Sequence, residues 1–221
     1  MLYCLPGEKS DRERNARLII HHMFRLYVQM MRFLGVLSYQ FEGVEKLRGA
    51  KLILSNHPSL LDVVFLISMV PNANCVVKGK LKRNFFTRGP VKAAGYIMNE
   101  EAGDVIDAAK RVIDDGQTLI IFPEGTRTSP SQGIRFKRGA ANIAIRTGSD
   151  ITPVLIYCSP TTLTSGEHWY QVPDRRIHFR IMVRDPLQID LYLRNTAASR
   201  ASRKLNVDLV NYFIRELEAH E

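Results

Sequence analysis

Cysteine is scarce in this chain of 221 residues, and the motifs of several common enzyme classes are missing. The three cysteines, Cys4, Cys75 and Cys158, are odd in number and not closely spaced, so we expect neither a disulfide framework nor a zinc site. There is no Gly-rich nucleotide loop and no Gly-x-Ser-x-Gly elbow, and the second absence argues against a covalent acyl-enzyme hydrolase. The sequence therefore predicts no metal ion and no bound cofactor, in a reducing, cytosolic setting.

Long uninterrupted apolar runs are also missing. The N-terminal residues do not lead from a basic segment into an apolar core with a cleavage site, so we expect no signal peptide. The apolar stretch from Leu18 to Leu37 is interrupted by Arg25 and Arg32, whose charges would be costly at a bilayer centre. We therefore do not expect this stretch to span a membrane.

The same stretch has helical periodicity. A polar stripe recurs at helical spacing and consists of Arg17, His21, Arg25, Gln29 and Arg32. The remaining arc is apolar and consists of Leu18, Phe24, Tyr27, Met30, Met31, Phe33 and Leu34. This pattern predicts a basic amphipathic helix in an N-terminal, membrane-associated region, residues 1–38. Docking on the protein's own core remains the alternative to membrane attachment.

Charge of one sign dominates the chain, with a formal net charge of +9 and a pI near 9.6. No acidic residue occurs from Val63 to Asn99, where basic residues flank Phe85-Phe86, and a second acid-free basic stretch follows Glu124. Such stretches form either a solvated face or a surface for anionic lipid. We expect anionic membrane lipids as a partner, on the cytoplasmic face and in peripheral or monotopic attachment, and no nucleic acid, because no nucleic-acid module is present.

Short apolar runs alternate with helical patterns through the rest of the chain. Strands are predicted at residues 51–54, 75–77, 118–121, 151–156 and 177–181. Helices are predicted at residues 60–69, 102–115, 139–147 and 199–218. Strands separated by helices predict an α/β fold with a mixed, largely parallel sheet flanked by helices, which forms one domain over residues 39–221.

The first chemically informative segment is Asn56-His57-Pro58-Ser59-Leu60-Leu61-Asp62, directly after a predicted strand. Pro58 disfavours helical geometry at His57, so the imidazole is expected before the helix, folded back toward Asp62 in its first turn. An aspartate that orients a histidine makes a general base near neutral pH. The alternative is a capping box, with Ser59 as the N-cap and no catalytic role for Asp62, and the two roles are compatible.

The second segment, Phe122-Pro123-Glu124-Gly125-Thr126-Arg127, follows another predicted strand. Ligands of open α/β sheets bind at the carboxyl ends of strands. Arg127 suits bidentate contact with a phosphate, while Glu124 suits a hydrogen bond to a glycerol-like hydroxyl or a brace for Arg127. The alternative is an ordinary turn closed by Pro123 and Gly125.

Together these segments resemble the glycerolipid acyltransferase family typified by bacterial 1-acyl-glycerol-3-phosphate acyltransferase. Their order and separation match, and Ile151-Thr152-Pro153-Val154 resembles the late Pro-containing strand of that family. The resemblance implies transfer of a fatty acyl group from acyl-CoA or acyl-carrier protein to a hydroxyl of a lysophospholipid or related lipid. It also implies His57 as general base and Asp62 as its orienter, with the acceptor held by Glu124, Gly125, Thr126 and Arg127.

The chain departs from the family pattern at Asn99, where an arginine normally helps to hold the acceptor phosphate. We therefore expect either an acceptor phosphate held by Arg127 together with Lys137 or Lys92, or an acceptor without a phosphomonoester. Two rival functions remain. The first is an acyl-thioester hydrolase in which water replaces the acceptor, and the second is a non-catalytic basic membrane-binding protein.

Overall fold

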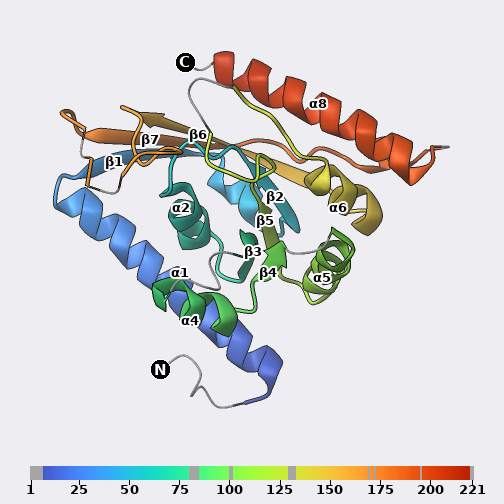
Figure 1. The fold of residues 1–221 in the computed structure, drawn as a ribbon, viewed down its shortest axis with the longest axis horizontal. Coiled ribbons are helices and arrows are strands. Elements are labelled where there is room, and N and C mark those ends of the chain that lie inside the picture. The colour runs from blue at the N-terminus through green and yellow to red at the C-terminus, as the bar shows by residue number, and fades with distance from the viewer. Residues whose placement is uncertain are drawn as a thin grey trace.

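A seven-stranded mixed sheet forms the centre of the protein (Figure 1). The computed structural model describes residues 7–79, 85–99, 102–128, 133–168, 170–171, 173–194 and 196–219. The strands are β1 (Leu37–Glu42), β2 (Leu52–Ser55), β3 (Ala73–Lys78), β4 (Ile97–Asn99), β5 (Thr118–Ile121), β6 (Ile151–Ser159) and β7 (Ile177–Val183). Their order is β1-β7-β6-β2-β5-β3-β4, and every neighbouring pair is parallel except β6 with β7. The predicted fold class is confirmed.

Helices cover both faces of this sheet. They are α1 (Lys9–Phe33), the short 3₁₀ helix η2 (Val44–Leu47), α2 (Asp62–Met69), α4 (Phe85–Ala93), α5 (Ala102–Asp114), α6 (Gly139–Thr147), α7 (Asp190–Leu193) and α8 (Ala198–Glu218). Helices α1, α2 and α4 lie on one side, and α5, α6 and α8 on the other (Figure 1). The predicted helices at 102–115, 139–147 and 199–218 match the last three within a residue.

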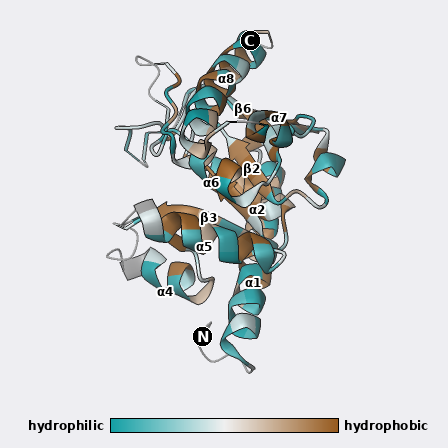
Figure 2. Ribbon diagram, turned by 90° about the vertical axis from the view of Figure 1, so that its right-hand side faces the viewer, coloured by the Kyte–Doolittle hydropathy of each residue, from teal (hydrophilic) through white to brown (hydrophobic). Residues whose placement is uncertain are grey.

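The central strands are apolar along their whole length because the sheet is buried on both faces. Leu52 and Leu54 of β2 point into the core beneath α5, α6 and α8, whereas Ile53 points into the core beneath α1 and α2. All three side chains are fully buried. Continuous apolar runs are typical of parallel strands enclosed in this way, and β2 is coloured as hydrophobic in Figure 2.

The predictions missed β1, β4 and α4. In β1, Leu37, Tyr39 and Phe41 alternate with polar residues close behind the N-terminal helix, which ends at Phe33, and no strand was predicted there. Strand β4 has only three residues, too few for a periodic signal. The basic residues Lys80, Lys82 and Arg83 of the first acid-free stretch, with the side chains of Phe85 and Phe86, lie outside the described residues.

Helix α1 packs on the protein, mainly against α2, with a face that is apolar except for two polar residues. Arg17 and His21 of the polar stripe are buried. The Arg17 guanidinium donates to the Asn72 side chain and to the Ala94 carbonyl, both at 2.8 Å, and His21 Nδ1 lies 2.8 Å from the Ile67 carbonyl. These partners pair the buried polar groups, which would otherwise be costly to remove from water.

The predicted apolar arc of α1 is divided, because Phe24 and Met31 pack against the core, while a set of apolar residues, here called the exposed arc, faces outward. Phe33 is 89% exposed, Leu26 67% and Met23 63%, and the arc continues through Met30 and Leu34. The inner face of α1 is also largely apolar, with Ile20 and Val28 buried and Phe24 and Met31 packed against the core, so the helix carries apolar side chains on two sides. Within the described part of the chain, no helix is both long enough and apolar enough to cross a bilayer. The division of the chain at residues 38 and 39 stays a prediction.

Candidate active site

Two loops meet at the carboxyl ends of the adjacent parallel strands β2 and β5. The backbone N–H of His57 donates to Glu124 Oε1 at 2.9 Å, and the N–H of Thr128 donates to the His57 carbonyl at 2.7 Å. The Thr128 hydroxyl donates to the same Glu124 oxygen at 2.9 Å. The structure therefore brings together the two segments that the sequence singles out, through bonds that fix the His57 backbone on both sides.

His57 and Asp62 are in direct contact. His57 Nδ1 lies 2.9 Å from Asp62 Oδ2, and the same oxygen accepts the Ser59 backbone N–H at 2.7 Å. The prediction that Ser59 is the N-cap is wrong, because α2 begins at Asp62 after Leu61. The carboxylate nevertheless makes the reach-back bond of a capping box, so one oxygen serves both the helix start and the imidazole.

Burial sets the electrostatics of Asp62. Its side chain has no solvent exposure, and this desolvation raises the carboxyl pKa, against the opposing hydrogen bonds from His57 and Ser59. The second carboxyl oxygen, Oδ1, has no hydrogen-bond partner among the described residues. The His57 side chain keeps 15% exposure and stacks on Phe122, with ring centroids 4.2 Å apart. The imidazole is thus held in orientation and still reachable from solvent.

Glu124 lies behind the loop and is only 7% exposed. Burial raises the pKa of its carboxyl, while the hydrogen bonds from Thr128 and the His57 N–H oppose the rise. Among the described residues Glu124 forms no ion pair with Arg127, so the brace for Arg127, one of the two roles considered for Glu124, is not formed. The carboxylate instead fixes the backbone of the candidate base.

Arg127 is half-buried and donates through Nη1 to the Leu163 carbonyl at 2.7 Å. The same carbonyl accepts the Leu60 N–H at 3.2 Å, so the segment after β6 is tied to both loops. Leu163 has a left-handed backbone, with φ of 52°, which is uncommon for a side chain of this size. Arg127 therefore carries a structural contact besides any role toward a ligand.

Lys137 completes the second loop. Its N–H donates to the Pro123 carbonyl at 2.8 Å, and its exposed side chain crosses Gly125. Gly125 has φ of 69°, and a Cβ there would lie 3.1 Å from the Lys137 ammonium nitrogen. The left-handed backbone therefore favours glycine here, and the missing Cβ leaves room for the lysine side chain. Thr126 is exposed beside it.

Asn56 is a site residue whose role the sequence did not reveal. Its buried amide donates to the Ile156 carbonyl and accepts the Ile156 N–H, both at 2.8 Å. The side chain thus continues the pairing of β2 with β6 one residue beyond the strand. Its position next to His57 was the available signal, because a polar residue directly after a buried strand needs partners.

Within the described residues, no three His, Cys, Asp or Glu side chains are arranged to hold a metal ion. The side chains that form the candidate site are the oriented imidazole of His57, the buried carboxyls of Asp62 and Glu124, and the cations Arg127 and Lys137.

Known proteins share the sequence and the fold of this region. A family model described as Acyltransferase matches residues 38–157. The 1-acyl-sn-glycerol-3-phosphate acyltransferase of Helicobacter pylori is 35% identical over 115 residues, 49% of this chain and 48% of that protein. The beta form from Homo sapiens is 27% identical over 141 residues, 58% of this chain and 50% of that protein. The chain thus spans about half the length of these relatives.

A solved structure extends the likeness of the fold to nearly the whole chain. The 1-acyl-sn-glycerophosphate (LPA) acyltransferase PlsC from Thermotoga maritima superposes with a TM-score of 0.69, at 19% identity, over 98% of this chain and 86% of that one. At this identity the likeness concerns the fold alone.

Proposed function

We propose that this chain, which belongs to the acyltransferase family, transfers a fatty acyl group from an acyl thioester to a hydroxyl of a lysophospholipid. The observation that carries the proposal is the 2.9 Å contact between His57 Nδ1 and the buried Asp62 carboxyl. Beside it, Arg127 and Lys137 supply cations suited to the phosphate of an acceptor.

His57 acts as the general base in this proposal. With Nδ1 donating to Asp62, the imidazole carries its lone pair on Nε2, which takes the proton from the acceptor hydroxyl as that oxygen attacks the thioester carbonyl. A C–O bond forms and the C–S bond breaks. The thiolate leaves with the proton that His57 returns, so the base ends in its starting state.

The acceptor headgroup is proposed to lie along the second loop. Arg127 retains donors besides the Nη1 group that holds Leu163, because a guanidinium carries five N–H groups. Lys137 crosses the same loop at Gly125. In the family pattern an arginine stands where this chain has Asn99, and the two cations would take over its role of holding a phosphomonoester. This favours a phosphorylated acceptor such as 1-acyl-glycerol-3-phosphate, the substrate in the names of the relatives.

An assay of the purified protein tests the transfer. Acyl-CoA or acyl-carrier protein is supplied with a panel of lysolipids, and the diacyl products are identified by mass spectrometry. We expect a diacyl product and release of free thiol in equal amounts. Free fatty acid with no diacyl product would establish the hydrolase instead, and absence of both products from every donor would overturn the proposal.

We also propose that the exposed arc of α1 attaches the protein to the membrane surface. Exposed Met23, Leu26 and Phe33 supply the apolar area, and Arg25 and Arg32 on the same helix supply positive charge for anionic lipids. Attachment by this face would give the enzyme its lipid acceptor and place it peripherally on the membrane.

Flotation with vesicles of mixed anionic and zwitterionic phospholipid tests this attachment. Leu26→Ser combined with Phe33→Ser should abolish most binding, and added salt should weaken the binding of the unchanged protein. Val207→Ser is the matched control, because Val207 is also an exposed apolar residue on a long helix but lies on α8. Equal binding by the double variant and the control would count against attachment through α1.

A further inference from the structure

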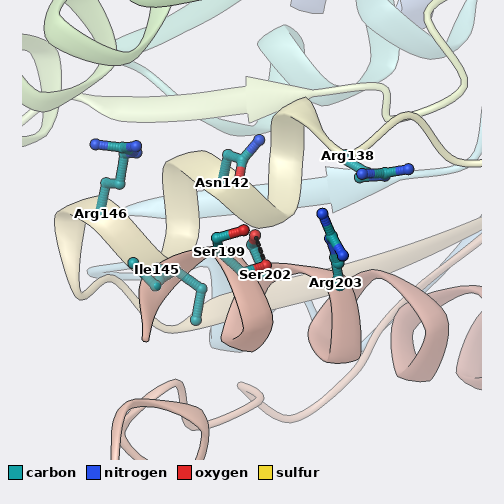
Figure 3. Close-up of a pocket in the computed structure, with 8 residues that line it drawn as sticks. Arg138, Asn142, Ile145, Arg146, Ser199, Ser202 and Arg203 are labelled. Atoms are coloured by element: carbon teal, nitrogen blue, oxygen red, sulfur yellow. Dashed lines mark hydrogen bonds between the residues drawn. The ribbon is translucent and has the colours of Figure 1, made fainter. Parts of the chain in front are cut away.

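A groove lined by arginines lies between α6 and α8, outside the candidate active site. Its cavity has a volume of about 180 Å³. The residues that give it its chemistry, here called the arginine groove, are Arg138, Asn142, Arg146, Ser199, Ser202 and Arg203. In Figure 3 the first three come from α6 or the residue before it, and Arg203 rises from α8 toward them.

The charge in the arginine groove is uncompensated. None of the residues that line it is acidic. Within the described part of the chain, the side chains of Arg138, Arg146 and Arg203 form no ion pair and no hydrogen bond, and all three are exposed. Ser202, in contrast, is buried and donates to the Ser199 carbonyl. Three unpaired guanidinium groups around one concavity suit phosphate groups, which arginine binds in bidentate geometry.

The arginine groove begins beside the candidate active site. Arg138 directly follows Lys137, whose side chain crosses Gly125. From Arg138 the groove follows α6 to Arg146, a distance of about 12 Å at the helical rise per residue. A long ligand with phosphates in the groove would therefore have its other end directed toward the loop that contains Glu124.

The position of the groove favours a soluble ligand over a membrane headgroup. Helices α6 and α8 lie on the face of the sheet opposite α1 (Figure 1). If the exposed arc of α1 contacts the bilayer, as proposed above, the arginine groove faces away from the lipid. Its concave shape and small volume suit the phosphates of a small molecule better than a carrier protein, whose interface needs about 800 Å² on each partner.

We infer that the arginine groove binds the phosphate groups of a coenzyme A thioester, the acyl donor of the reaction. This assignment rests on the proposed transferase function for the role of the ligand, and on the groove itself for its phosphate chemistry. The nucleotide phosphates contact the three arginines, and the pantetheine arm passes Lys137 to deliver the thioester carbonyl to His57.

Calorimetric titration with coenzyme A tests the inference without any turnover. Arg146→Gln combined with Arg203→Gln should raise the Kd for coenzyme A by about twentyfold or more, because charge-assisted contacts to phosphate are lost. Arg200→Gln is the matched control, since Arg200 is an exposed arginine in the first turn of α8 that does not line the groove. The coenzyme A Kd of this control variant should stay within about twofold of the Kd of the unchanged protein.

A second ligand sharpens the titration. Dephospho-coenzyme A lacks the 3′-phosphate and should bind the unchanged protein more weakly than coenzyme A. The difference in binding free energy between the two ligands should shrink in the Arg146→Gln, Arg203→Gln protein, because the 3′-phosphate contributes less once the arginines that contact it are gone. In turnover, the same double variant should raise the KM for acyl-CoA and leave the KM for the acceptor unchanged.

Two results would overturn the inference: a coenzyme A Kd that the double variant leaves unchanged, or turnover with acyl-carrier protein alone and no measurable coenzyme A binding. A wild-type protein without acyl transfer from any donor would defeat the proposed function instead. The titration still decides on the groove in that case, since it requires no catalysis.

Discussion

The two loops that meet at the candidate site differ in how their polar groups are satisfied. In the loop after β2, the Asn56 amide, the His57 backbone and the His57 imidazole all have partners within the protein. In the loop after β5, Thr126 and Lys137 face solvent, and Arg127 is half-buried. The first loop is held by hydrogen bonds from β6, from the second loop and from Asp62, while the second loop, apart from its buried Glu124, carries cations that solvent can reach.

This difference matches two tasks of an enzyme site. A general base must be held in one geometry, which demands buried and paired neighbours. A binding residue must remain available to a charged ligand, which demands exposure. The four predictions below test the division between the loops, from the largest expected effect to the smallest.

Replacement of the imidazole should have the largest effect. His57→Ala should lower kcat for acyl transfer by about a hundredfold or more, in line with a general base, while the thermal midpoint stays near that of the unchanged protein. His178→Ala is the control, because His178 is an exposed histidine on β7. A folded His57→Ala protein with near wild-type turnover would remove His57 from the chemistry.

Loss of the two hydrogen bonds between Asn56 and Ile156 should chiefly lower the stability of the protein. Asn56→Leu leaves the buried N–H and carbonyl of Ile156 unpaired, so we expect the free energy of unfolding to fall by about 2–4 kcal/mol in urea denaturation. If the variant stays folded, kcat should fall more than KM rises, since the His57 backbone loses its fixed position. An unchanged unfolding midpoint would show that the end of β2 is held without this side chain.

Truncation in the second loop should instead affect binding. Arg127→Ala should raise the KM for phosphomonoester acceptors by about thirtyfold, equivalent to about 2 kcal/mol, with a smaller change for acceptors without phosphate. Arg135→Ala, an exposed arginine in the same basic stretch, is the control. Equal effects on both kinds of acceptor would reduce Arg127 to a brace for the Leu163 carbonyl.

The smallest effect concerns the pH dependence of stability. Burial raises the pKa of Glu124 above its ordinary value of 4.5, so the folded protein holds this proton more firmly than the unfolded chain. The stability contributed by the protonated form is complete below pH 4.5 and is lost as the pH rises through the folded pKa. The free energy of unfolding of Glu124→Gln minus that of the unchanged protein should therefore increase as the pH rises through this window and then stay constant.

Urea denaturation at a series of pH values measures this difference. Asp62, whose pKa burial also raises, is present in both proteins, so its contribution cancels except for its Coulomb interaction with Glu124. A stability difference between the Glu124→Gln and unchanged proteins that does not vary with pH would mean that Glu124 titrates alike in both states.

Much of the architecture was predictable because the central strands are buried on both faces and read as apolar runs. The runs at 51–54 and 118–121 became β2 and β5, and the polar segments that follow them became the site. The edge strand β1 was missed because its alternating residues adjoin a helical pattern, and the short β4 was missed because three residues carry no period. The N-cap at Ser59 was wrong because Asp62 starts the helix while also holding His57.

The orientation of α1 could not be predicted from its periodicity. Spacing alone separates polar from apolar positions, but apolar residues occur on two sides of this helix, so spacing does not show which side docks on the core. Arg17 faces inward only because Asn72 and the Ala94 carbonyl, from distant parts of the chain, satisfy its guanidinium. The same holds for the arginine groove, whose members are far apart in sequence and adjacent only because α6 packs on α8.

Local sequence by itself determined which residues follow the strands and which chemistry they carry, since apolar periodicity and the nature of His57, Asp62 and Arg127 are properties of short segments. Only the tertiary structure decided which of them meet. The order of strands placed β2 beside β5, so Glu124 reached the backbone of His57, and it placed β6 beside β2, so Asn56 reached Ile156. Hydrogen bonds between residues so distant in sequence form only when a common sheet brings their backbones within reach.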